Sequence, residues 1–388
     1  MNIMGNLMSL NRRRGVVSVA LMTLVAMLVI AVVGSPESKS ASSVDAQLKI
    51  ANANLKPYLG HPSPERPIEK LKKLPKGKSV AVLNCGIPSC NVVWDQIQQP
   101  AKQIGMKVFQ VKAGNDPQTL STALDSALAR NPSGVLSVSQ PKTIFPKAAL
   151  ATMKSKGIPL IGVAVPEIPG PKDNPAVIYN TATVKTESKL MADYAFTKAK
   201  GNTKAAFFWP TELSLFSTMA KGFVAEMKAR CPSCSAANVP VSISTIGTTL
   251  PSRVVSYLQQ NPKVNWLGFA FGDLTSGVPQ ALKAAGINNV KIVTQGGAGA
   301  VLADIRAGRI DSSINVDSYY QAYQEVDAFA RAFAGQKQPP QYVNSGITQP
   351  AQFFTKDTTT AADAKRGGLL AYPNTYKKTF LKAWGLSK

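Results

Sequence analysis

The chain has 388 residues, of which 45% are hydrophobic and 17% are charged, and its formal net charge is +23. This is an ordinary globular composition with room for two domains. The basic excess indicates an anionic neighbourhood, but the lysines are scattered singly, as at Lys142, Lys147 and Lys154, and form no basic cluster with interleaved aromatic residues. We therefore expect an anionic cell envelope as the neighbour and no nucleic-acid partner.

The N-terminal residues, 1–34, predict an export signal. Arg12-Arg13-Arg14 gives a positively charged start, residues 16–33 are almost wholly apolar, and Val32-Val33-Gly34 offers small residues for cleavage. The apolar run is also just long enough to span a bilayer, so an uncleaved signal anchor is the alternative. We expect an exported protein, periplasmic or at the cell surface, that is either released or tethered by this segment.

Residues 35–77 are rich in Ser, Pro and Lys, which predicts a tether with a short helix near residues 44–54. From residue 78 onward, short apolar runs alternate with amphipathic segments. The expected strands are residues 80–83, 107–111, 134–138, 159–163, 205–208, 239–244, 266–269, 291–294 and 312–316. This alternation predicts an α/β protein with two similar Rossmann-like lobes, each a parallel sheet with helices on both faces. A ligand of such sheets sits outside the carboxyl ends of the strands.

The four cysteines form two close pairs along the sequence. The short spacings of Cys85 with Cys90 and of Cys231 with Cys234, together with export, favour two local disulfides. A four-cysteine zinc site is the alternative, and it would require the two pairs to converge from distant parts of the chain. The Cys-x-x-Cys spacing of the second pair also resembles a redox motif, but it follows a predicted helix instead of beginning one, where a thiol pKa would be lowered.

The sequence does not contain the residues of a catalytic centre. Its one histidine, His61, lies in the predicted tether, and the chain has no nucleophile elbow, phosphate-binding loop or metal-ligand cluster. The glycine-rich run that begins at Gln295 is not a full dinucleotide-binding fingerprint. We therefore expect a protein that binds a small molecule and is not an enzyme, with no cofactor and no metal.

Several short sequence segments of the predicted folded body resemble one family. They are Gly105-Met-Lys-Val, Ser155-Lys-Gly-Ile-Pro-Leu-Ile-Gly162, Lys221-Gly-Phe223, Phe271-Gly-Asp273 and Ala307-Gly-Arg-Ile-Asp-Ser-Ser-Ile314. In their order along residues 78–355, they are similar to the type I periplasmic binding proteins, the ribose-binding and related sugar-binding group that serves ABC importers. The resemblance implies a monomeric solute-binding protein that delivers a small-molecule ligand to an ABC transporter permease. A ligand-sensing subunit for a membrane receptor is the alternative with the same fold, whereas the export signal argues against a repressor.

The resemblance also implies three hinge crossovers between the lobes. We place them near Tyr179–Ala182, near Val316–Ser318 and near Asn344–Gln349. The expected domains are then the signal at 1–34, the tether at 35–77, an N-terminal lobe of residues 78–181 plus 317–345, and a C-terminal lobe of residues 182–316 plus 346–388. Members of the family close their lobes on the ligand by hinge bending.

Residues in the loops after the strands are the candidates for ligand contact. They are Asn91, Trp94, Gln140, Glu167, Trp209, Phe216, Asp273, Gln295, Asn315 and Asp317. Three of them have a second interpretation, because Trp94 would also suit the core of the first helix, Glu167 a solvated position, and Asp273 the N-cap of the next helix.

The predicted fourth strand departs from the sugar-binding pattern. Relatives commonly have an Asp-Arg pair after this strand, where this chain has Ala164 and Val165. Because a buried hydroxyl without a partner costs about 1–3 kcal/mol, we expect a ligand less polar than a simple sugar, aromatic or partly hydrophobic. A sugar ligand, as in the rest of the family, is the alternative.

Overall fold

The computed structural model describes residues 36–60, 68–167, 175–297, 299–343, 346–347, 349–365 and 375–387. The chain divides into a short N-terminal unit, residues 1–41, and a large unit, residues 42–388, which holds both lobes. The predicted export signal lies outside the described residues. No helix of the described part is both long and apolar enough to cross a membrane.

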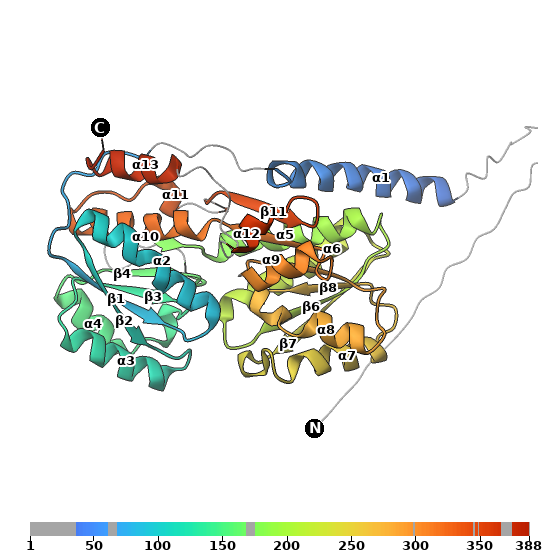
Figure 1. Ribbon diagram of the computed structural model, residues 1–388, viewed down its shortest axis with the longest axis horizontal. Helices are drawn as coiled ribbons and strands as arrows, with labels where there is room; N and C mark the ends of the chain where they lie inside the picture. Colours follow the sequence, from blue (N-terminus) through green and yellow to red (C-terminus); the bar gives the residue numbers. More distant parts are fainter. Residues whose placement is uncertain are drawn as a thin grey trace, which may run out of the picture. The chain divides into compact units, whose positions relative to one another are not determined.

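The first lobe is built on a parallel sheet, seen on the left of Figure 1. Its described strands have the order β2-β1-β3-β4-β5. They are β1 (Ser79–Asn84), β2 (Lys107–Lys112), β3 (Gly134–Val138), β4 (Leu160–Val163) and β5 (Val177–Ile178). The helices are α2 (Pro88–Ile104), α3 (Pro117–Ala129), α4 (Lys147–Ser155) and, from later in the chain, α10 (Ser318–Phe333).

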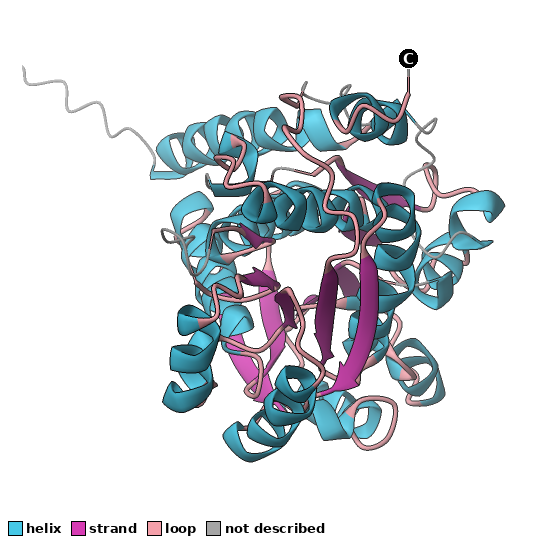
Figure 2. Ribbon diagram, turned by 90° about the vertical axis from the view of Figure 1, so that its left-hand side faces the viewer, coloured by secondary structure: helices cyan, strands magenta, loops and turns pink. Residues whose placement is uncertain are grey.

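Alternate residues of β1 explain why helices cover both faces of this sheet. Val80 and Val82 belong to the core that includes residues of α2 and α10, whereas Ala81 and Leu83 belong to the core that includes residues of α3 and α4. Successive side chains of a strand point to opposite faces, so a strand that is apolar throughout is buried between two helical layers. Figure 2 shows the strands enclosed by helices on either side.

The second lobe repeats this plan with the described strand order β11-β10-β9-β8-β6-β7. The strands are β6 (Lys204–Pro210), β7 (Ser235–Val241), β8 (Trp266–Phe269), β9 (Lys291–Gln295), β10 (Ser312–Val316) and β11 (Ala351–Thr355), of which β11 is antiparallel. The helices are α5 (Thr181–Lys198), α6 (Ser214–Arg230), α7 (Leu250–Gln260), α8 (Val278–Ala284), α9 (Gly299–Arg306) and α12 (Ala361–Lys365). Phe207 packs on Phe223 of α6, and its neighbour Phe208 packs on Tyr257 of α7.

The chain passes between the lobes near the first two predicted hinges, whereas the third, near Asn344–Gln349, includes residues 344, 345 and 348, which lie outside the described residues. β5 of the first sheet leads into α5 of the second lobe, β10 leads into α10, and α11 (Pro340–Val343), which contacts β5, precedes β11. The predicted two-lobed α/β fold with mainly parallel sheets is therefore confirmed. The expected strand at 239–244 is displaced, since β7 spans Ser235–Val241 and is an edge strand with mostly exposed or half-buried residues.

Both ends of the described chain differ from the predicted domain plan. α13 (Thr375–Ala383), which the prediction assigned to the second lobe, packs on α10 of the first lobe through Phe380, whose ring lies 5.3 Å from that of Tyr323. In the predicted tether, α1 (Pro36–Leu55) has Asn54 bonded to Asp193 of α5 at 2.8 Å. Further along, Leu71 is buried and its N–H donates to the Ala383 carbonyl. These stretches are short and rich in polar residues, so they give little sign of packing in the sequence.

A candidate ligand-binding cleft between the lobes

A cleft lies where the carboxyl ends of the two sheets face each other, as parallel α/β sheets predict. It encloses a cavity of about 160 Å³, below the roughly 300–1,000 Å³ that drug-sized ligands occupy. Its lining residues come from both lobes and from the hinge. They include Ser89, Val92, Val93, Val138, Ser139, Val163, Ala164, Tyr179, Leu213, Phe216, Phe271, Asp273, Gln295, Asn315, Ser318 and Gln321. The cavity therefore suits a small metabolite.

Apolar side chains make up most of the walls. On the first lobe, Val138 and Val163 end β3 and β4 beside Val92 and Val93 of α2. On the second lobe, Phe216 and Phe271 form a tilted pair with ring centroids 5.1 Å apart. Such walls exclude water and favour a ligand with apolar surface.

Three cleft residues at strand ends have left-handed backbone conformations that non-glycine residues rarely adopt. Ser139 follows β3 with φ +70°, Ala164 follows β4 with φ +56°, and Tyr179 follows β5 with φ +59°. Backbone strain of this kind persists where the surrounding structure enforces it, and it gathers at functional sites. Three of the strands of the first lobe, β3, β4 and β5, thus turn sharply at the point where they reach the cleft.

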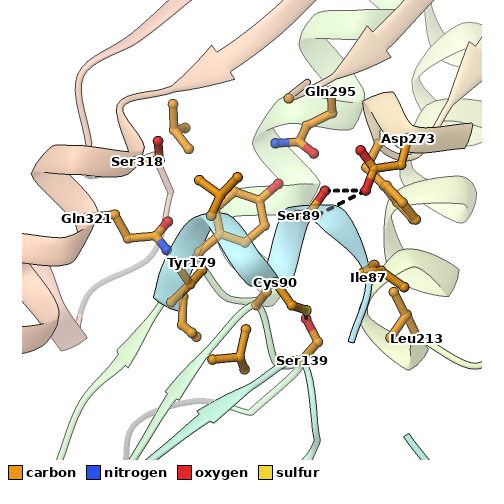
Figure 3. A pocket seen from close by; sticks show the side chains of 18 of the residues that line it. Ile87, Ser89, Cys90, Ser139, Tyr179, Leu213, Asp273, Gln295, Ser318 and Gln321 are labelled. Atoms are coloured by element: carbon orange, nitrogen blue, oxygen red, sulfur yellow. Dashed lines mark hydrogen bonds between the residues drawn. The ribbon is translucent and has the colours of Figure 1, made fainter. Parts of the chain in front are cut away.

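A hydrogen-bonded contact joins the lobes across the cleft (Figure 3). The carboxylate of Asp273, in the turn after β8, accepts from the backbone N–H of Ser89 at 3.1 Å and from its hydroxyl at 2.7 Å. Ser89 lies in the first turn of α2, whose N–H groups have no partner within the helix and whose dipole favours an anion. Asp273 therefore caps a helix of the opposite lobe. The interpretation that it caps the next helix of its own lobe is wrong, because α8 has Gly277 at its N-cap.

Tyr179 connects the hinge to a buried carboxyl group behind the cleft. Its hydroxyl donates to Glu187 of α5, which is fully buried. Burial raises the pKa of Glu187 to about 8, although hydrogen bonds from Tyr179 and Gln295 act in the opposite direction. Burial and the nearby Glu187 carboxyl also raise the pKa of Tyr179. Glu187 is therefore largely protonated at neutral pH, and its hydrogen-bond partner, Tyr179, lines the cleft.

The α10 side of the cleft has a similar arrangement. Gln321 lines the cleft, and its Nε2 donates to Oε1 of Glu325, one helical turn further on, at 3.0 Å. Glu325 is fully buried, and burial raises its pKa to about 8. Like Glu187, it bonds to a cleft side chain while remaining out of reach of solvent.

The structure brings four of the predicted contact residues to the cleft. These are Phe216, Asp273, Gln295 and Asn315. Ala164, the position at which sugar-binding relatives commonly carry a charged pair, also lines the cleft, whereas Val165 is buried behind it. Gln295 and Asn315 lie at the carboxyl ends of β9 and β10, Asp273 lies in the turn after β8, and Phe216 lies in the first turn of α6.

The other six predicted residues lie outside the cleft lining, three of them close to it. Asn91 accepts a hydrogen bond from Asn84, and Asp317 caps α10 by accepting from the Tyr320 N–H at 2.9 Å. Trp94, the third, lies on α2 and is half-buried against the core. This agrees with the alternative interpretation that Trp94 is a core residue of the first helix.

The remaining three residues serve the fold of loops and strands. Gln140 is buried and bonds to Ser137. Glu167 is half-buried and accepts from the Lys142 N–H, and burial raises its pKa. Trp209 is half-buried within β6 and packs on the core.

Several cleft residues were not predicted as contacts. Val92, Val93, Leu213 and Phe271 are apolar, and periodicity alone assigns such residues to a core. Tyr179 was assigned only a hinge position. Gln321 was not singled out, and its place one turn inside α10, directly after the second crossover, is the signal that would have identified it.

The two predicted disulfides, Cys85–Cys90 and Cys231–Cys234, are both present in the structure. The first closes the loop between β1 and α2, and Cys90 lines the cleft. This pairing removes the four-cysteine zinc site, and the described residues contain no cluster of potential metal ligands.

Solved structures with the same fold are solute-binding proteins. One from Thermotoga lettingae, in complex with 5-methylthioribose, has a TM-score of 0.65 at 15% identity and covers 81% of this chain and 100% of its own. One from Agrobacterium vitis with bound allitol has a TM-score of 0.64 at 17% identity over 76% of this chain and 100% of its own. An arabinose-binding component from Shewanella, with arabinofuranose, has a TM-score of 0.63 at 16% identity and covers 74% of this chain and 95% of its own.

These identities are low, so the structures establish the shared fold only. Comparison with curated protein sequences finds no significant match. The family model described as "Periplasmic binding protein domain" matches residues 80–337, about two thirds of the chain. Families of this kind bind small ligands outside the cytoplasm for ABC transporters and are not enzyme families. With its two hinged α/β lobes and the cleft between them, this chain belongs to the periplasmic binding protein domain family.

Proposed function

We propose that this chain is the extracytoplasmic solute-binding component of an ABC importer and that it holds a small neutral carbohydrate derivative with an apolar part. The observation that carries this proposal is the cleft itself, which has mainly apolar walls from both lobes together with uncharged polar side chains and one carboxylate. The match to the family model supports the transport role. The net charge of +23 supports work beside an anionic cell envelope.

The ligand class follows from two lines of support that are independent of each other. The similar structures carry sugars or polyols, which favours a carbohydrate over the aromatic ligand that the sequence suggested. The Phe216–Phe271 pair and the valines of the first lobe favour a ligand with fewer hydroxyls than a free pentose. A deoxy or alkylated sugar satisfies both, and 5-methylthioribose, found in one of the similar structures, is a molecule of this type.

Thermal shift followed by calorimetry on the full chain tests the proposal. The probes are 5-methylthioribose, arabinose, tagatose and allitol, with phenylacetate as an aromatic acid outside the proposed class. We expect at least one neutral probe to stabilise the protein, since ligand at about 100 times its Kd adds about 2.7 kcal/mol. Stabilisation by phenylacetate alone would contradict the proposed ligand class.

Matched variants locate the binding. Phe216→Asp places a charge in the apolar wall and should abolish the stabilisation by the probe. Trp209→Phe is the control, because this aromatic residue of the same lobe lies outside the cleft lining. Equal loss in both variants, or in neither, would contradict the proposed site.

A further inference from the structure

We infer that two buried glutamates, Glu187 and Glu325, fix the hydrogen-bonding polarity of the cleft, so that oxygen acceptors face the ligand. The ligand must then present hydroxyl or amine donors and carry no negative charge. This inference rests on the proposed function for its ligand, but the role of the two glutamates can be tested without one. Neither residue touches the cleft itself, so both are positioning residues.

On the hinge side, Glu187 engages the donor groups of two cleft residues. The Tyr179 hydroxyl donates its only proton to Glu187, so that the phenol oxygen is left with lone pairs for a ligand. Gln295 lies close enough to Glu187 to lower the pKa of that carboxyl group, as an amide N–H facing it would. In Figure 3 the amide nitrogen of Gln295 lies on the side of the Tyr179 hydroxyl and its oxygen on the side of Asp273.

On the α10 side, Glu325 orients Gln321 in the same way. The Gln321 amide nitrogen is held at 3.0 Å from the glutamate, and the two ends of an amide group point in opposite directions. The Gln321 oxygen is therefore directed away from Glu325. The other oxygen of Glu325 has no partner within the described part of the chain, so the hydrogen bond to Gln321 is the one that its side chain makes there.

The hydrogen-bond partners of Glu187 and Glu325 indicate that these glutamates position cleft side chains and do not serve the fold alone. Burying a carboxyl group costs free energy, and the usual compensation is a set of bonds to the surrounding fold. The hydrogen bond of Glu187 goes to Tyr179, that of Glu325 goes to Gln321, and the other oxygen of each glutamate has no partner within the described part of the chain. Both partners line the cleft, as does Gln295. The two buried carboxyl groups thus act on side chains that face the ligand.

The charges around the cleft lead to the same ligand class. The described residues that line it include one carboxylate, Asp273, and no Lys, Arg or His. A carboxylate or phosphate on the ligand would meet the oxygens of Gln295 and Gln321 and the charge of Asp273, with no cation to compensate. Hydroxyl and amine groups, by contrast, can donate to these acceptors.

The role of the glutamates is tested by NMR of the side-chain amides in the unliganded full chain. Glu187→Leu should shift the Gln295 amide signals and leave those of Gln321 in place, and Glu325→Leu should do the reverse. The isosteric variants Glu187→Gln and Glu325→Gln retain a carbonyl acceptor and should restore signals close to those of the wild type. Unchanged amide signals in both leucine variants would overturn the inference.

The ligand class is tested by thermal shift with matched probes that differ in charge. These are galactose, galactosamine and galacturonate, ribose and ribose 5-phosphate, and the neutral sugars named above. We expect only neutral or amino probes to stabilise the protein, with affinity about ten-fold weaker in Glu187→Leu and nearly restored in Glu187→Gln. An anionic probe that stabilises more than its neutral partner would overturn the inference. Failure of every probe would count against the proposed function, whereas the amide spectra would still decide the role of the glutamates.

Discussion

The substitution Glu187→Gln should flatten the dependence of stability on pH. Burial raises the pKa of Glu187 from 4.5 to about 8 in the folded protein. Between these two values the folded state keeps a proton that the unfolded state has lost, so stability falls as pH rises. The contribution of the buried acid is complete below the unfolded pKa and is lost by the time the pH reaches the folded pKa. Glutamine carries no titrating group, so the variant loses this dependence.

The expected magnitude follows from linkage. One group contributes a slope of about 1.4 kcal/mol per pH unit in the window between its two pKa values. Between pH 5.5 and pH 7.5 the free energy of unfolding of the wild type should therefore fall by about 2.7 kcal/mol because of Glu187, and that of the variant should not show this fall. Glu325, whose pKa is also raised to about 8, contributes a slope of the same sign in both proteins.

Urea denaturation of the full chain at pH 5.5, 6.5 and 7.5 measures these slopes. In the variant, the free energy of unfolding should fall less steeply with pH than in the wild type, by about 1.4 kcal/mol per pH unit. Glu69→Gln is the control, since this glutamate is exposed, and it should keep the wild-type slope. A wild-type slope in Glu187→Gln would refute the claim that the carboxyl group is buried in its protonated form.

Three further expectations concern the rest of the structure. Asp273→Ala removes the hydrogen bonds to Ser89 and should increase the radius of gyration of the unliganded protein in solution scattering. An unchanged radius would contradict a role of this contact in holding the lobes together. Arg230→Leu removes the ion pair of the fully buried Asp193, which keeps only its hydrogen bond from Asn54, and should cost about 3 kcal/mol in urea denaturation, with the Arg230→Leu/Asp193→Leu double variant less affected. Mass spectrometry without reduction should show the linked peptides Cys85–Cys90 and Cys231–Cys234, and free thiols would contradict the assignment.

The sequence predicts the sheets well where the strands are buried. β3 and β8 have the predicted bounds because each is a short, mainly apolar and fully buried run. β10 also has the predicted bounds, although three of its five residues are polar. β7 is displaced because an edge strand with exposed Ser235 and Asn238 has no such run. β11 was not predicted, since its antiparallel pairing with β10 depends on how the chain returns after α11.

The site is harder to predict because burial depends on the assembled lobes. Gln295 could be predicted, since it ends a strand and therefore reaches the cleft. Trp94 could not be placed from the sequence, because the face of α2 on which it lies depends on the helix beginning at Pro88. Glu187 and Glu325 have a polar character that predicts solvated helix faces, and only the packing of α5 and α10 buries them.

The central claim is that the cleft between the lobes binds a small neutral carbohydrate derivative, and calorimetric titration of the full chain with 5-methylthioribose and the related neutral sugars tests it most directly. We expect that at least one of these probes binds with one molecule per chain and that binding is lost in Phe216→Asp but retained in Trp209→Phe. No binding by any neutral probe, or binding that survives Phe216→Asp, would contradict it.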